Sequence, residues 1–235
     1  MKRRATLTLA LVALACARAE TPPVHQVSAR LAETRARAAS QIRGYTVLRR
    51  YSLSTGRGGH SAEMTVRLTY TWPRQKKFEI LSERGSNTIT KRVFHRLLKA
   101  EEDVSCDTRL TPNNYAFQME GVETLEGRRC YVLRLTPRTS EKYLVRGRAW
   151  VDASDFAIVK VEGEPVDTDS FWIKSSHVVQ RYRKVGGFWL PAVNESESEV
   201  RLFGQAHLTI ENFDYKINAA ETEDRAGLVR RTEVE

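Results

Sequence analysis

The sequence predicts an α+β fold in which about ten antiparallel strands form one curved sheet and two helices pack on it. Period-two alternation of apolar and polar residues fills most of the chain, and short turns separate the runs. Only two segments carry apolar residues at helical spacing, and no strand–helix–strand rhythm indicates a parallel sheet. Because a large sheet with one apolar face tends to curl, we expect the two helices to cover its concave face.

The first nineteen residues are typical of an export signal that is cleaved from the mature chain. Three basic residues open it: Lys2, Arg3 and Arg4. An apolar run from Ala5 to Ala15 and a small-residue cleavage site, Ala17-Arg18-Ala19, follow. This run is too short to cross a bilayer, which needs about 20 residues. We therefore expect the working protein outside the cytoplasm.

Cys16 leaves a second interpretation of the same segment open. It could become a lipid-modified N-terminus that anchors the protein in the outer membrane. The residues before it fit a bacterial lipobox poorly, because Ala13 stands where leucine is expected. Release as a soluble protein is therefore favoured over anchoring.

The N-terminal half of the mature chain alternates between helix and strand. A helix is expected over 27–43, rich in Ala, Arg and Glu, with Gly44 as its stop. Strands are expected at 45–51, 63–72 and 77–82, and the middle one shows the clearest alternation. Its large residues on one face, with two from the next strand, form an inward set: Met64, Val66, Leu68, Tyr70, Trp72, Phe78 and Ile80.

A second, amphipathic helix is expected over 89–101. Its apolar residues are Ile89, Val93, Phe94, Leu97 and Leu98. Seven strands follow, near 115–124, 128–136, 143–152, 156–163, 171–185, 188–199 and 204–217. No linker or repeat divides the chain, so residues 20–218 are expected to form one domain, with a charged, flexible tail at 219–235.

The charge of the chain argues against a nucleic-acid partner. The formal net charge is +9, and removal of residues 1–19 lowers it to +5, with 34 basic against 29 acidic residues. These basic residues are spread along the sequence, whereas a nucleic-acid binder concentrates them on one face.

No motif in the sequence indicates catalysis, a cofactor or a metal. The histidines are scattered without ligand spacing: His25, His60, His95, His177 and His207. The glycine-rich segment 56–59 lacks the Lys-Ser/Thr ending of a phosphate-binding loop, so it is read as a hairpin turn. Nucleophile motifs such as G-x-S-x-G are absent. We therefore expect a binding protein rather than an enzyme.

The mature chain keeps two cysteines, Cys106 and Cys130. In an oxidising compartment, such a pair can form a disulfide, which would stabilise the fold by about 3–4 kcal/mol. The alternative is two reduced, buried thiols. The bridge is the favoured expectation.

Several features together resemble the bacterial lipoprotein-sorting family that includes LolA, LolB and the N-terminal domain of RseB. One is the order of signal, helix, three strands, helical insertion and strand meander over residues 27–218. Another is Trp150-Val151-Asp152, followed by Asp155 and the strand 157–162. A third is the hairpin 186–191, with 210–217 closing the sheet.

The resemblance implies a periplasmic protein with an open half-barrel and a helical lid over an apolar cavity for acyl chains. The inward set would form the cavity wall, and the apolar residues of 89–101 would form the lid. The arginine that contacts the lid in the carrier has two candidates here, Arg43 and Arg49, and spacing does not decide between them. A carrier of this kind is expected to be a monomer that holds lipid or lipidated protein and contacts membranes transiently. The alternative is an RseB-like envelope sensor that binds another protein under lipid control.

Overall fold

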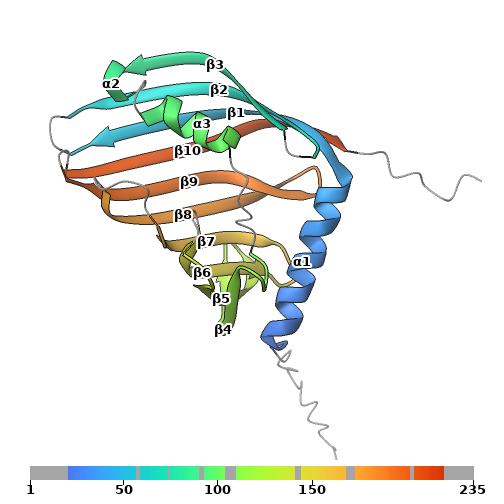
Figure 1. Cartoon of the computed structure of the whole chain (residues 1–235). Helices are drawn as coiled ribbons and strands as arrows, with labels where there is room; N and C mark the ends of the chain where they lie inside the picture. The colour runs from blue at the N-terminus through green and yellow to red at the C-terminus, as the bar shows by residue number, and fades with distance from the viewer. Residues whose placement is uncertain are drawn as a thin grey trace, which may run out of the picture.

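The chain folds into one open antiparallel sheet. The computed structural model describes residues 21–56, 59–73, 75–89, 93–103, 110–140, 144–167, 173–201 and 204–219. In this part of the chain ten strands lie in the order β3-β2-β1-β10-β9-β8-β7-β6-β5-β4. Figure 1 shows the sheet curving from β3 at one edge to β4 at the other, without closure. The predicted α+β class and the curved ten-stranded sheet are confirmed.

The strands agree closely with the segments predicted from the alternation of residues. Their bounds are β1 Ile42–Thr55, β2 Ser61–Thr71, β3 Gln75–Gly85, β4 Tyr115–Leu125, β5 Arg128–Pro137, β6 Val145–Asp152, β7 Ile158–Pro165, β8 Ile173–Val185, β9 Phe188–Val200 and β10 Gly204–Ala219. Every neighbouring pair is antiparallel, and only the β1–β10 pairing joins strands distant in the sequence.

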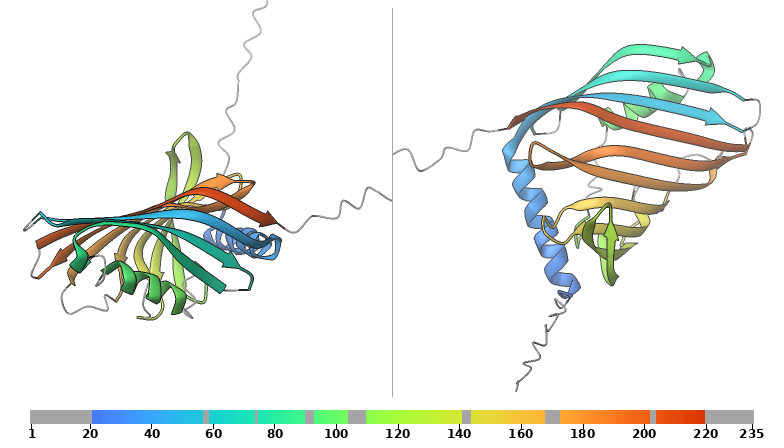
Figure 2. Two further views of the ribbon diagram at one scale, coloured as in Figure 1. Left: turned by 90° about the horizontal axis from the view of Figure 1, so that it is seen from above. Right: turned by 180° about the vertical axis from the view of Figure 1, so that it is seen from behind.

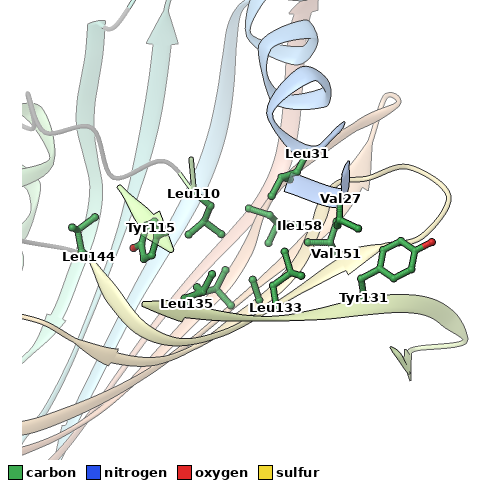
Figure 3. Close-up of a cluster of buried hydrophobic side chains, with 12 residues drawn as sticks. Val27, Leu31, Leu110, Tyr115, Tyr131, Leu133, Leu135, Leu144, Val151 and Ile158 are labelled. Atoms are coloured by element: carbon green, nitrogen blue, oxygen red, sulfur yellow. The ribbon is translucent and has the colours of Figure 1, made fainter. Parts of the chain in front are cut away.

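Helix α1 (Val24–Gln41) packs on the β5–β7 end of the sheet. Its Val27 and Leu31, four residues apart, project from one face and are completely buried among side chains of β5, β6 and β7 (Figure 3). Burial of each contributes about 1.5–3 kcal/mol. The helix ends where Ile42 adopts extended dihedral angles and begins β1 directly, two residues before the predicted stop.

The second predicted helix is divided into α2 (Asn87–Ile89) and α3 (His95–Asp103), which lie over β1, β2 and β3. Figure 2 shows that α1 and the α2–α3 segment lie toward opposite edges of the sheet. Among the described residues, no helix has both the length and the apolar character needed to cross a bilayer.

Strand register shows that both helical segments pack on the same face. Directly paired residues point to one side of a sheet. One such row crosses nine strands: Met64, Tyr51, Ile210, Asn194, Gln180, Val161, Ala149, Leu133 and Met119. Its first residues lie under α2 and α3, and its last residues belong to the cluster under α1. That this is the concave face stays a prediction.

The middle of this face is polar. Asn194 and Gln180 occupy the centre of the row, and the hydroxyl of Ser176 lies 2.9 Å from that of Ser198 nearby. The face therefore carries two separate apolar clusters, one under each helical segment, rather than a single continuous apolar surface.

Two facing glycines, Gly147 and Gly163, allow β6 and β7 to approach closely. A Cβ on Gly147 would lie 2.0 Å from the carbonyl oxygen of Glu162, and a Cβ on Gly163 would lie 2.2 Å from that of Arg146. No side chain fits at such distances. Glycines at such positions accompany tight bends, which agrees with the curvature of this end of the sheet.

Cys130 is a free thiol in the structure, which does not show the expected bridge to Cys106. Cys130 is completely buried on the opposite face of β5, beside Val132 and Trp150. Its sulfur lies 3.6 Å from the carbonyl oxygen of Arg128. The side chain thus fills a small core of its own, and Cys106 lies outside the described residues.

We expect the Cys130 thiol to be unreactive in the native protein. Burial raises its pKa to about 11, so almost no reactive thiolate exists at neutral pH. Titration with a thiol reagent should detect Cys130 only after unfolding in concentrated guanidinium chloride. A Cys130→Ala variant, which should lose that late signal, is the control. Absence of any free thiol in the unfolded, unreduced protein would contradict the free-thiol state.

Several predicted features fall outside the described residues. They are the export signal at 1–19, with Cys16, and the tail beyond Ala219, which ends β10.

Candidate functional site

The candidate site is the interface between the sheet and helices α2 and α3. An apolar cluster fills it, here called the lid cluster: Tyr51, Ala62, Met64, Val66, Ile89, Phe94 and Leu98. The rings of Tyr51 and Phe94 lie with centroids 5.8 Å apart. The alternation of β1 and β2 brings the strand residues to one face, and the helical spacing brings the others to meet them.

The structure brings most of the predicted wall residues together. Met64, Val66 and Leu68 are buried, and Phe78 packs against the lid cluster. Tyr70 lies farther along the same face, where its ring stacks on Tyr45 with a centroid distance of 5.1 Å. In this structure wall and lid side chains touch directly, so the lid cluster is packed like a core.

Trp72 and Ile80 depart from the expected inward set. Trp72 follows the end of β2 and is 52% exposed, with its ring 5.3 Å from the guanidinium of Arg43. Ile80 lies on the edge strand β3, where it is 42% exposed. A register shift between Thr65 and Val66 interrupts the pairing of β2 with β3 beside it.

All five predicted lid residues contact the lid cluster or belong to it. Ile89, Phe94 and Leu98 are buried, whereas Val93 and Leu97 are half-buried. A side-chain contact between His95 and Glu83 of β3, 2.6 Å apart, also holds the start of α3 near the sheet edge.

A polar network joins α3 to the sheet beneath it. We call it the lid latch: Arg49, Tyr51, Glu101 and Asn212. The Arg49 guanidinium donates through Nε to Asn212 Oδ1 at 2.8 Å and through Nη1 to Glu101 Oε2 at 2.6 Å. The Tyr51 hydroxyl donates to Glu101 Oε1 at 3.1 Å. Arg49 and Glu101 are only 11% and 27% exposed, so this ion pair is largely shielded from water.

Two donors of the lid latch have raised pKa values. Burial raises the pKa of Tyr51, which keeps its hydroxyl protonated as a donor. Burial opposes the charge of Arg49, but Glu101 and Tyr51 together outweigh it and raise the pKa of the guanidinium. The Tyr51 hydroxyl and the Arg49 guanidinium therefore both stay protonated donors at neutral pH.

The two arginines that the sequence left open lie in different surroundings in the structure. Arg49 makes the contact with α3, whereas Arg43 lies over the Trp72 ring. Asn212 and Glu101 were not among the predicted site residues. The period of β1 places Arg49 on the same face as Val47 and Tyr51, but in the sequence it places Arg43 there too, so the alternation alone could not single out Arg49.

A second polar network ties three hairpin ends together at the α1 end of the sheet. Asp152 Oδ1 accepts from the backbone of Ser154 and Asp155, and Oδ2 accepts from Arg128 Nε at 2.6 Å. Asp155 Oδ2 accepts from Arg128, from Lys184 and from the indole nitrogen of Trp189, all within 3.1 Å. Asp152 and Asp155, which the sequence analysis noted as part of the family resemblance, thus hold this network together.

Two pockets lie away from the lid cluster's centre. One, of about 450 Å³, opens at the ends of β1 and β2 near Ser54 and His207. The other, of about 440 Å³, lies between α1 and the β8–β9 turn. Within the described ranges, no three His, Cys, Asp or Glu side chains lie close enough to hold a metal ion.

Comparison with known proteins identifies one family. Its model matches residues 99–222, more than half of the 235 residues, and its description reads "-like: Uncharacterized protein". No curated protein matches the chain significantly.

Solved structures similar to this chain include three bacterial proteins. One is a DUF1329 family protein from Desulfovibrio piger, at 13% identity and a TM-score of 0.47, covering 84% of this chain and 94% of that one. Another is a putative outer membrane lipoprotein-sorting protein domain from Vibrio parahaemolyticus, at 14% identity and a TM-score of 0.46, covering 86% of this chain and 94% of that one. A third is a LolA superfamily protein from Nitrosomonas europaea, at 12% identity and a TM-score of 0.43, covering 84% of this chain and 94% of that one. The second and third of these proteins carry the names of the lipoprotein-sorting family that the sequence resembles.

Proposed function

The chain belongs to the family whose model matches residues 99–222, and we propose that it is an exported binding protein for lipid or lipidated protein. Acyl chains would lie between the sheet and helices α2 and α3. The observation that supports this proposal is an apolar cluster between sheet and helices whose helical cover is short and is joined to the sheet by a polar network.

The lid cluster offers the surface that an acyl chain needs. Each buried methylene contributes about 0.8 kcal/mol, so a long acyl chain offers about 10 kcal/mol before the entropy cost of binding. In the structure Phe94 and Leu98 occupy the apolar face of β1 and β2. A ligand would take their place when α3 moves away, and the lid side chains would then cover it.

Helix α3 is suited to such movement. It spans nine residues, and α2 spans three. Isolated helices shorter than about 12–15 residues are marginal in water, so α3 depends on its contacts with the sheet. Most of these contacts are the lid cluster, the lid latch and the His95–Glu83 pair. An apolar ligand therefore has to replace only a small number of interactions to displace α3 from the sheet.

The periplasmic location in this proposal is inferred from the export signal at residues 1–19. Cleavage after Ala19 would release the protein into the periplasm, where lipids and lipidated proteins need a carrier. Mass measurement of the mature protein tests this, since a chain beginning at Glu20 supports release. A mature chain beginning at a lipid-modified Cys16 would instead make it a tethered acceptor.

Crosslinking of the lid tests the proposed function. In a Cys106→Ser background, the variant Glu83→Cys/His95→Cys places one thiol on β3 and one on α3, where the native side chains touch. The unlinked protein should bind a fluorescent fatty acid. After reaction with a short bis-maleimide, affinity should fall about tenfold or more, because α3 can no longer leave the sheet.

The Cys106→Ser variant alone, treated with the same reagent, should keep its binding. Unchanged affinity after crosslinking would place the ligand elsewhere and contradict the role of α3. Failure of every unlinked variant and of the unmodified protein to bind any acyl probe would contradict lipid binding itself.

A further inference from the structure

A pocket between helix α1 and the end of the β8–β9 hairpin is separate from the lid cluster. Its volume of about 440 Å³ lies within the usual range for small-molecule sites, about 300–1,000 Å³. Helix α1 contributes Arg35 and Arg37, and the strands contribute Tyr182 and Trp189. The pocket therefore joins one wall of positive charge to one wall of aromatic surface.

Among the described residues, the two arginines of this pocket have no counter-ion. In the part of the chain that the structure describes, neither the Arg35 nor the Arg37 guanidinium makes a hydrogen bond or an ion pair. Arg35 is half-buried and close enough to Tyr182 for its charge to act on that hydroxyl, although burial raises the Tyr182 pKa overall. A partly desolvated guanidinium with free donors favours an anionic ligand.

The one carboxylate that lines the pocket is already neutralised. Asp155 Oδ2 receives donors from Trp189, Lys184 and Arg128 at 2.9, 3.0 and 3.1 Å. The hydrogen bond from Trp189 is the main cause that lowers the Asp155 pKa, and the hydrogen bond from Lys184 lowers it further. With two cations on one carboxylate, the electrostatic balance of the pocket stays positive.

Most of the remaining lining is apolar, although Thr34 and Gln41 of α1 and Lys184 also reach the pocket. Tyr182, Phe188 and Trp189 supply aromatic surface, and Ile158 and Pro191 supply aliphatic surface. A free inorganic anion would leave these groups without a partner, whereas an uncharged lipid would leave Arg35 unpaired. Both halves are satisfied only by a molecule that carries an anionic group on an apolar body.

We propose that the pocket between α1 and the β8–β9 hairpin binds an anionic amphiphile, with its phosphate or carboxylate at Arg35 and Arg37 and its apolar part against Ile158, Tyr182 and Pro191. This site is distinct from the proposed acyl site under α3. It holds or fails independently of that proposal, because it shares no lining residue with the lid cluster.

Calorimetric titration of the full mature protein with decyl phosphate tests the proposal. The Arg35→Gln variant should bind decyl phosphate about tenfold more weakly, the loss expected for one charge-assisted hydrogen bond. Arg37→Gln, at a more exposed position of the same wall, should weaken binding in the same direction. Arg30→Gln is the matched control on the same helix, because Arg30 lies over the Phe156 ring outside the pocket. Its affinity should equal that of the unmodified protein.

Two further ligands separate the possible sources of binding. Decyl maltoside carries the same chain without charge, and inorganic phosphate carries the charge without the chain. Both should bind at least about tenfold more weakly than decyl phosphate. Equal affinity for decyl maltoside, or for inorganic phosphate, would overturn the amphiphile proposal.

The lid-crosslinked protein distinguishes this site from the acyl site. It should keep its affinity for decyl phosphate even where fatty-acid uptake is lost. Unchanged decyl phosphate binding in Arg35→Gln, with loss of binding on crosslinking, would show that the ligand enters under α3 and would overturn the assignment.

Discussion

Replacement of Arg49 by alanine is expected to lower the free energy of unfolding by about 3 kcal/mol. The substitution removes the cation from the lid latch and leaves the shielded Glu101 carboxylate and Asn212 Oδ1 without their donor. An unpaired buried charge costs more than the lost attraction itself. Urea unfolding followed by circular dichroism measures the change. The same variant should bind acyl probes faster, because α3 is held less firmly.

Arg50→Ala is the matched control for this experiment. Arg50 is the next residue of β1 and pairs with Glu211, but both side chains are more than 40% exposed. Its loss should cost less than about 1 kcal/mol, as for other surface pairs. If Arg49→Ala and Arg50→Ala destabilise the protein equally, the lid latch is not a buried interaction in solution. Glu101→Ala should reproduce most of the Arg49 effect.

Replacement of Asp152 by alanine is expected to cost about 3 kcal/mol as well. Asp152 is almost completely buried at the turn between β6 and β7. Its carboxylate accepts two backbone N–H donors and the Arg128 guanidinium, so alanine leaves three donors without an acceptor. Thermal unfolding should show the loss as a lower midpoint.

Glu79→Ala controls for the removal of a carboxylate as such. Glu79 pairs with Arg67 on the surface, where its side chain is 62% exposed, so its loss should cost less than about 1 kcal/mol. Asp152→Asn keeps an acceptor oxygen and should be milder than Asp152→Ala. An Asp152→Ala protein as stable as Glu79→Ala would contradict the structural role given to the network.

The strands were predictable because their burial follows period two. In β2 the exposed residues alternate with Met64, Val66 and Leu68, and the structure keeps that alternation through most of the strand. The predicted order of elements is confirmed for the same reason, and the strand bounds agree with the prediction to within four residues. The second helix was less predictable, because its apolar spacing runs through the residues between α2 and α3.

Features that depend on tertiary contact could not be predicted from the pattern. Trp72 continues the alternation of β2, but the strand has ended before it, and Arg43 covers one side of its ring. The polar centre of the sheet face arises from the pairing of β8 with β9, which brings Gln180 beside Asn194. The free state of Cys130 likewise depends on which face of β5 it occupies.

The direct passage from α1 into β1 joins the two ends of the molecule. Helix α1 ends at Gln41, β1 begins at Ile42, and the same strand carries Arg49. A tilt of α1 must therefore turn the first peptides of β1, since no loop lies between them to absorb it. The α1 pocket and the lid latch share one continuous main chain.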